Sequence, residues 1–300
     1  MDSIDKNTFF SYIAGYIDGD GCFYIGKPSG DRTRYQAKII ITSVNQEVLH
    51  WISTTFRGSI QYKVPQKTTH KPVYYLNISP KASLLLSENT LPYLVEKSDE
   101  AKLFIDFARS KKENKKAAAE EMNKIKNFNN LVSKNHKEEF ELLRATIKPT
   151  KEDFAYLAGF IDAECCLGIQ KYKSKHRSNP LYKIQLQCNN TKAPIFKWLL
   201  QRFGGQIHFI DRNTRNPDHR NQLTWRLSSK ALSNILKDIH PFLRYKKPVC
   251  EELINFTNIT LANGGARHTD IFRKSYSEIL KQREEIVRKI HLLNLKGINV

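Results

Sequence analysis

The feature that most constrains the fold is an internal repeat. Residues 12–25 read YIAGYIDGDGCFYI and residues 156–169 read YLAGFIDAECCLGI, so seven of the fourteen positions are identical. Weaker matches follow in the same order: YYLNISPKASLLL from Tyr74 is similar to LTWRLSSKALSNIL from Leu223, and LPYLVEK from Leu91 is similar to HPFLRYK from His240. A repeat of this length predicts two copies of one structural unit within the chain.

The repeat divides the 300 residues into four parts. We expect an N-terminal repeat at 1–110 and a C-terminal repeat at 149–262. Residues 111–148 are rich in Lys, Glu, Asn and Ala, but apolar residues recur at helical spacing, which predicts a partly helical linker and not a free tether. Residues 263–300 form a C-terminal helical extension, in which the pattern from 269 to 295 predicts an amphipathic helix.

The charge balance favours a polyanionic partner. Lys and Arg number 49 against 30 Asp and Glu, a formal net charge of +19. Such an excess favours nucleic acid, with an anionic membrane surface or solvated basic helices as alternatives. No apolar run is long enough for a transmembrane helix, and the polar start lacks the pattern of a secretory signal. Five cysteines without a C-x-x-C pair argue against a disulfide scaffold and a zinc ribbon, and favour a reducing intracellular compartment.

Each repeat opens with a helical pattern and then changes to a period of two, which is typical of strands. The alternation predicts strands at 22–28, 34–43, 59–65 and 72–79 in the first repeat and at 166–173, 181–189, 206–212 and 221–228 in the second. In both opening helices small residues lie four apart: Gly15 and Gly19, then Gly159 and Ala163. Glycine inside a helix costs about 1 kcal/mol relative to alanine, so we expect the two helices to pack closely on each other. A helix packed on its own sheet is the alternative.

One face of the predicted strands is apolar and includes Tyr62, and the other carries amides, cations and tyrosines. A solvated sheet face can show the same alternation. Gln, Asn, Lys and Arg are, however, the side chains that bind base edges in the major groove. The candidate DNA-binding residues are Tyr24, Gln36, Lys38, Thr42, Gln61, Lys63, Tyr75 and Asn77 in the first repeat, and Gln170, Lys183, Gln185, Gln187, His208, Arg212 and Arg226 in the second.

The segments IAGYIDGDG at 13–21 and LAGFIDAEC at 157–165 resemble the LAGLIDADG signature. The chain resembles the single-chain, two-repeat LAGLIDADG homing endonucleases encoded in group I introns, from about residue 5 to residue 262. The resemblance implies an α+β fold of two pseudo-symmetric αββαββα repeats. Each repeat would form an antiparallel, saddle-shaped sheet that lies on DNA, and the two signature helices would pack together at the dyad.

The resemblance also implies the metal site. The metal-binding acid of the family is the eighth letter of the signature, here Asp20 and Glu164, and Gly19 and Ala163 beside them belong to the same implied site. Two carboxylates at converging helix ends suit two or three Mg²⁺ ions, for which Mn²⁺ can substitute, because such ions activate water and neutralise charge on a phosphate. Two solvated helix ends are the alternative.

Further residues follow from the same resemblance. The family places a lysine near each acid, and the spacing from Pro92 and Pro241 assigns Lys97 and Lys246, with Lys247 as a competitor. A polar residue after the second strand joins the water network, which assigns Asn45 and, as its counterpart, Lys192. Asp18 and Asp162 are duplicated as well, and we expect them to form hydrogen bonds at the helix ends and not to bind metal. Cys165 replaces the last glycine of the signature, so the second helix is expected to end slightly differently.

These features favour a metal-dependent DNA endonuclease that hydrolyses phosphodiester bonds. The resemblance implies cleavage across the minor groove of a long, asymmetric target, short 3′ overhangs and a role in intron mobility. An RNA-binding maturase that assists the splicing of a group I intron and a DNA-binding regulator are the alternatives, but the presence of both acids favours the nuclease. We expect a monomer on double-stranded DNA, with intron RNA as the alternative partner and no obligate protein partner or membrane. The expected compartment is an organelle (chloroplast or mitochondrion) or a bacterial cytoplasm.

Overall fold

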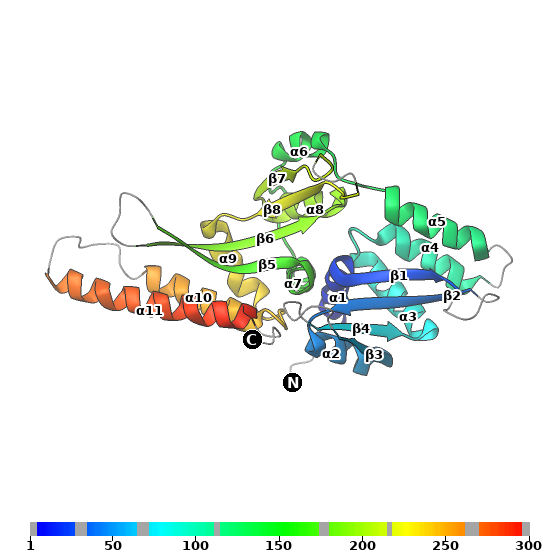
Figure 1. Cartoon of the computed structure of the whole chain (residues 1–300), viewed down its shortest axis with the longest axis horizontal. Helices are drawn as coiled ribbons and strands as arrows, with labels where there is room; N and C mark the ends of the chain where they lie inside the picture. Colours follow the sequence, from blue (N-terminus) through cyan, green and yellow to red (C-terminus); the bar gives the residue numbers. More distant parts are fainter. Residues whose placement is uncertain are drawn as a thin grey trace.

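The chain folds into two similar halves that lie side by side (Figure 1). The structure is a computed structural model, which describes residues 5–27, 35–64, 72–110, 115–173, 180–214, 218–261 and 270–295. Each half contains a four-stranded antiparallel sheet with helices on one face, so the α+β prediction is confirmed. Within the described residues, none of the helices is both long and apolar enough to cross a membrane.

The N-terminal half begins with the predicted order of a helix, two strands, a helix and two strands, and it ends in two helices where the αββαββα pattern has one. Its elements are α1 (Lys6–Asp20), β1 (Gly21–Gly26), β2 (Gln36–Ser43), α2 (Gln46–Phe56), β3 (Gly58–Lys63), β4 (Val73–Ile78), α3 (Pro80–Thr90), a 3₁₀ turn (Leu91–Tyr93) and α4 (Ser98–Arg109). The C-terminal half repeats this order with α7 (Lys151–Glu164), β5 (Cys165–Tyr172), β6 (Leu181–Asn190), α8 (Ala193–Phe203), β7 (Gln206–Ile210), β8 (Gln222–Arg226), α9 (Ser229–Ile239) and α10 (Lys247–Leu261). All eight predicted strands are present, with ends within two residues of the prediction.

The two sheets have the same topology. Their strand orders are β1-β2-β4-β3 and β5-β6-β8-β7, so the strand that follows each signature helix lies at a sheet edge. Alternate residues are buried under the helices, as Phe23, Ile39 and Leu76 show in the first sheet and Leu186 and Trp225 in the second. Tyr62 is an exception to the predicted apolar face. It is 56% exposed and lies on the edge strand β3, where its ring is tilted against that of Tyr74 with the centroids 5.4 Å apart.

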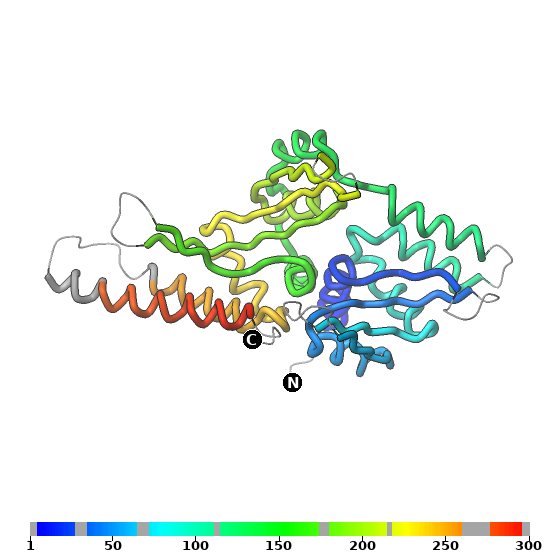
Figure 2. Tube along the Cα trace, viewed as in Figure 1, coloured from blue at the N-terminus to red at the C-terminus, as the bar shows by residue number. Residues whose placement is uncertain are grey.

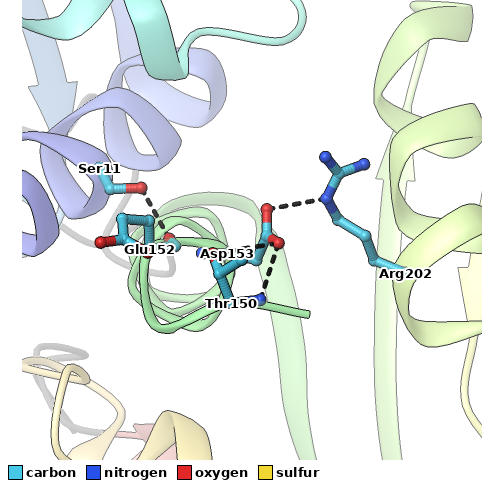
Figure 3. Close-up of polar contacts among 5 residues, drawn as sticks. All are labelled: Ser11, Thr150, Glu152, Asp153 and Arg202. Carbon is cyan, nitrogen blue, oxygen red and sulfur yellow. Dashed lines mark hydrogen bonds and ion pairs between the residues drawn. The ribbon is translucent and has the colours of Figure 1, made fainter. Parts of the chain in front are cut away.

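The signature helices α1 and α7 form the junction between the halves, as predicted. A Cβ atom built on Gly15 would lie 2.0 Å from the backbone oxygen of Tyr156, and one built on Gly159 would lie 2.0 Å from that of Tyr12. Only glycine allows backbones to approach this closely. At the start of the pair, the Ser11 hydroxyl donates to the carbonyl of Glu152 at 2.7 Å, which adds a polar contact between the halves (Figure 3).

The start of α7 is fixed by capping. Thr150 and Asp153 form the predicted capping box, and the Asp153 carboxylate also accepts from the guanidinium of Arg202 on α8 at 2.7 Å (Figure 3). A side chain that caps a helix start satisfies N–H groups that have no partner within the helix. These contacts hold the signature helix against the rest of its own half.

The linker and the C-terminal extension occupy equivalent places. Linker helix α5 (Lys115–Phe128) packs on α4 and β1, and α11 (Asp270–Leu295) packs on α10 and β5 (Figure 2). Each sheet edge next to the junction is therefore flanked by one additional helix. A second linker helix, α6 (Lys134–Glu141), packs on α8 and β7. Of the apolar linker residues, Met122 and Phe140 are buried, whereas Phe128 is 74% exposed.

Candidate active site and nucleic-acid interface

The two candidate metal-binding acids meet where the signature helices end. Asp20 is the last residue of α1, and Glu164 is the last residue of α7. A Cβ atom built on Gly19 would lie 2.5 Å from the Cβ of Ala163 and 3.4 Å from the Cβ of Glu164, so the two helix ends are in contact. The structure thus brings all four residues of the expected metal site together.

The surroundings of the acids favour neutralisation by a cation. Burial and the charge of Glu164 raise the pKa of Asp20 to about 7, although Lys97 and Lys246 oppose the rise. Partial desolvation also raises the pKa of Glu164. The described residues contain no group of three or more His, Cys, Asp or Glu that could hold a metal. A metal held here would therefore depend on two carboxylates and on oxygen ligands from water and substrate, a donor set that suits Mg²⁺.

The second pair of acids has the structural role that was expected. The carboxylate of Asp18 accepts from the backbone N–H of Val95, Glu96 and Lys97 at 2.8 to 3.1 Å, and Asp162 does the same for Arg244, Tyr245 and Lys246 at 2.8 to 3.2 Å. Each carboxylate also accepts from a tyrosine of the other half: Tyr156 donates to Asp18 at 2.5 Å and Tyr12 donates to Asp162 at 2.8 Å. These acids connect the dyad to the segments that carry the site lysines.

The lysines of the two halves lie against the ends of the signature helices. The Lys97 ammonium donates to the carbonyls of Ile17 and Asp18 at 2.8 and 2.6 Å. The Lys246 ammonium donates to the carbonyls of Ile161 and Asp162 at 2.5 and 3.0 Å. A cation is favoured at a helix C-terminus, where carbonyls lack partners. The carbonyls that bind the two ammonium groups belong to residues two and three positions before Asp20 or Glu164.

The structure decides between the two candidate lysines of the second half. Lys246 occupies the position equivalent to Lys97. Lys247 instead lines a cleft of about 690 Å³ on the flank of the junction, together with Trp51 and Arg244. The guanidinium of Arg244 lies 3.4 Å from the ring centroid of Trp51 in this cleft. Lys246, and not Lys247, therefore occupies the position that corresponds to Lys97.

The residues after the second strands differ between the halves. Asn45 caps α2, because its Oδ1 accepts from the N–H groups of Glu47 and Val48, and its Nδ2 is buried without a partner among the described residues. The backbone N–H of Asn45 donates to the Ser43 hydroxyl at 3.2 Å. Lys192 does not play the expected part. Its ammonium instead donates to the carbonyls of Ile125, Lys126 and Asn129 at 3.3, 3.0 and 2.6 Å, so it caps the end of the linker helix.

The cysteine in the second signature leaves the helix end unchanged, contrary to expectation. Gly21 has φ −87° and ψ 158°, and Cys165 has φ −95° and ψ 152°, so both chains leave the helix in the same extended conformation. Cys165 pairs with Cys188 on β6 in a disulfide, which the sequence did not predict. Cys22, Cys166 and Cys250 are free thiols in the described part of the chain.

All candidate DNA-binding residues except Arg212 lie on strands and share one face of each sheet. The prediction for Arg212 is wrong in this respect, because β7 ends at Ile210 and Arg212 lies in the loop that follows it. Strand register places Tyr24 opposite Lys38, Thr42 opposite Tyr75, and Gln61 also opposite Tyr75 in the first sheet. In the second sheet Gln170 lies opposite Lys183, and Gln187 lies opposite Arg226. Because side chains alternate along a strand, this is the face away from the core helices. The first strand of each sheet, β1 or β5, begins directly after Asp20 or Glu164, so each polar face starts beside an acid.

Part of the second polar face is already ordered by hydrogen bonds. Nε of Arg226 donates to Oε1 of Gln187 at 3.0 Å, and the Gln187 amide donates to Asn189 at 3.3 Å. The Thr224 hydroxyl donates to the same Asn189 oxygen at 2.6 Å. Such a row of fixed donors and acceptors suits recognition of base edges, because less side-chain freedom is lost on binding.

Several residues near the site were missed by sequence reasoning. Tyr12 and Tyr156 each donate a hydrogen bond to an aspartate of the other half. The buried Ser43 hydroxyl accepts from Tyr16 at 2.8 Å. The duplicated tyrosines of the two signatures could have suggested the first pair. Ser43 carries no comparable signal, because its counterpart in the second half is Asn190.

Comparison with solved structures gives the same fold. The I-SmaMI LAGLIDADG homing endonuclease bound to cleaved DNA is 18% identical, with a TM-score of 0.61 over 94% of this chain and 95% of that chain. The LAGLIDADG meganuclease I-AabMI bound to uncleaved DNA is 20% identical, with a TM-score of 0.59 over 97% and 99%. I-GzeII in complex with its DNA target is 16% identical, with a TM-score of 0.60 over 94% and 98%. The fold is that of single-chain, two-repeat LAGLIDADG proteins, as the two signatures predicted. No protein-family model and no curated protein matches the sequence.

Proposed function

We propose that the chain is a site-specific endonuclease that cuts both strands of double-stranded DNA. The observation that carries the proposal is the junction, where two acids and two lysines from duplicated segments meet between two polar sheet faces. The net charge of +19 favours a polyanion. The similar structures I-SmaMI, I-AabMI and I-GzeII are described as DNA-bound, which further supports a DNA substrate.

Each group at the junction has a part in phosphodiester hydrolysis. Asp20 and Glu164 would hold divalent ions, and a bound Mg²⁺ would supply an activated water and neutralise charge on the phosphate. Lys97 and Lys246 present ammonium groups that stabilise charge as the phosphate is attacked. The buried, unpaired amide nitrogen of Asn45 would orient a water of the site. The buried bonds of Asp18 and Asp162 keep these groups in place.

The unlike polar faces of the two halves support an asymmetric target read by a monomer. Lys38, Lys63 and Asn77 lie on one half, whereas Gln185, His208 and Arg226 lie on the other. We further propose cleavage across the minor groove with short 3′ overhangs, and a role in intron mobility. Sedimentation of the protein with DNA tests the oligomeric state, and an obligate dimer would contradict a single-chain nuclease.

The direct test is cleavage of a randomised duplex library in Mg²⁺. We expect a subset of duplexes to be cut on both strands by the wild-type protein, and none by the double variant Asp20→Asn, Glu164→Gln or in EDTA. Recovery of bound but uncut duplexes would favour a DNA-binding regulator. Selective binding of structured RNA without cleavage of any duplex would favour the maturase.

A further inference from the structure

The two halves of the candidate active site have the same backbone but different charges. Around Lys97 lie four more charged side chains, which we call the linker-side cluster: Glu96, Glu100, Lys126 and Lys192. They come from the N-terminal half, the linker and the C-terminal half. At the equivalent positions around Lys246 the chain has Tyr245, Val249, Asn294 and Asn45. Every charged member of the cluster is thus replaced by an uncharged residue in the other half.

The equivalences rest on matched contacts. The Lys126 ammonium donates to the carbonyl of Phe23 on β1 at 2.5 Å, and the Asn294 amide donates to the carbonyl of Leu167 on β5 at 3.4 Å. Phe23 and Leu167 are each the third residue after an acid of the signature. Lys192 and Asn45 are the N-cap residues of α8 and α2.

Glu100 is at the centre of the cluster. It is only 6% exposed, and its Oε2 has no hydrogen-bond partner among the described residues. Burial raises the pKa of this carboxyl, while the charges of Lys97, Lys126 and Lys192 lower it. A buried carboxylate with an unpaired oxygen is tolerated where nearby cations offset its charge. For Glu100 the offsetting charges are three ammonium groups from three parts of the chain.

Glu96 and Lys126 contact further segments near Lys97. Glu96 accepts from the amide of Asn190 at 2.6 Å, a bond between the two halves. The Lys126 ammonium also lies 3.1 Å from the sulfur of Cys22, two residues after Asp20. The net pKa of Lys97 is raised, because the negative charges of Glu96, Asp18 and Glu100 outweigh the lowering by burial. The net pKa of Lys246 is lowered, because burial outweighs the charges of Asp162 and Asp20.

We propose that Glu100 and Lys126 are positioning residues for Lys97. The linker helix α5 then contributes a charged residue to one half-site, whereas the equivalent residue of the other half-site, Asn294, is uncharged. The proposal rests on the proposed endonuclease function. Loss of either charge leaves an unbalanced buried charge beside Lys97 and displaces its ammonium. Cleavage of one DNA strand then depends on the linker, and cleavage of the other does not.

The test uses a duplex recovered from the randomised library, labelled on both strands, with single-turnover cleavage in Mg²⁺. Glu100→Gln and Lys126→Met should each reduce the cleavage rate of one strand by about tenfold, and it should be the strand that Lys97→Met also affects. The cleavage rate of the other strand should stay within about twofold of wild type. The double variant should recover most of the lost rate, because both charges are removed together. Lys126→Arg should cleave both strands like wild type.

Lys124→Met is the matched control. Lys124 lies on the same helix and is exposed, and its only ion pair within the described part of the chain is with Glu121, so both strands should be cut at the wild-type rate. The second strand and DNA affinity report on folding within each variant. Equal slowing of both strands by Glu100→Gln or Lys126→Met, or a double variant slower than either single one, would overturn the proposal while leaving the endonuclease intact. A library without any cut duplex would instead refute the endonuclease itself.

Discussion

Replacing Gly15 by alanine tests the helix junction on which the candidate site depends. The added Cβ would lie 2.0 Å from the Tyr156 backbone oxygen and 2.9 Å from its carbonyl carbon. Ordinary contact begins near 3.4 Å, so α1 and α7 must part by about 1.4 Å. Both partners are backbone atoms, and no change of rotamer relieves the clash.

The expected cost follows from two opposed effects. Overpacking of a filled interior costs roughly 1–3 kcal/mol or more, and a backbone clash of this size belongs at the upper end. Alanine regains about 1 kcal/mol of helix propensity. The free energy of unfolding should therefore fall by about 2 kcal/mol or more, which lowers the melting temperature by about 4 °C at this chain length.

The same movement should affect the reaction. Asp20 lies five residues after Gly15 on one rigid helix, so parting the helices also parts Asp20 from Glu164. A misplacement of about 1 Å can reduce a catalysed rate about a hundredfold. We expect Gly15→Ala to retain DNA binding through the sheets and to lose most of its cleavage.

Calorimetry and single-turnover cleavage of the same samples provide the assay. Gly159→Ala should behave like Gly15→Ala, because its Cβ would lie 2.0 Å from the Tyr12 oxygen. Gly168→Ala is the control, since the only neighbour of its Cβ is the Asn294 amide nitrogen at 3.4 Å. An unchanged melting temperature for both junction variants would refute the close helix packing.

Four further predictions concern the charged and polar groups. Asp20→Asn and Glu164→Gln should each suppress cleavage of both strands but leave binding in a gel-shift assay largely intact, and loss of one strand only would argue against a shared metal site. Lys97→Met and Lys246→Met should slow opposite strands of a labelled duplex, since loss of one charge-stabilising group costs about 3 kcal/mol, and equal slowing of both strands would contradict the assignment. Arg226→Ala and Lys38→Ala should relax base preference locally by about 1–3 kcal/mol, and an unchanged preference profile would make these residues phosphate or solvent contacts. The pKa of Asp20 is raised from 3.8 to about 7, so folding takes up a proton in that pH range and the stability of the fold decreases as the pH rises through it. In EDTA, the melting temperature of the wild-type protein should therefore fall between pH 4 and 7, and Asp20→Asn should reduce that fall. Parallel curves for the two proteins would contradict the raised pKa.

Much of the fold was predictable because two local signals occur twice. The change from helical spacing to a period of two located all eight strands, and the glycines at positions 15 and 159 predicted the helix junction. Each signal depends only on the chain near it: side-chain alternation on a strand, and the absence of a Cβ on a helix. The acids Asp20 and Glu164 were predicted from the resemblance of the two segments to the LAGLIDADG signature, and each ends its helix.

Residues whose role depends on distant neighbours were not predictable. Lys192 follows the second strand as Asn45 does, but its long side chain reaches the end of α5, which no local pattern places beside it. Lys246 and Lys247 differ only by one position at a helix start, and the choice required the position of α7. Tyr62 has the correct strand parity, but it lies where the helices no longer cover the sheet.

The duplicated aspartates explain why the halves can differ in charge and still share a geometry. Asp18 and Asp162 each fix three backbone N–H groups of the segment before the site lysine and one tyrosine of the other half. All four bonds are buried or partly buried and involve backbone or duplicated residues, so they place Lys97 and Lys246 alike. The side chains just beyond this frame, such as Glu96 and Tyr245, are not part of it and can diverge. A single chain thereby allows one half-site to recruit charged residues of the linker while the other has uncharged residues at the equivalent positions, which two identical subunits could not do.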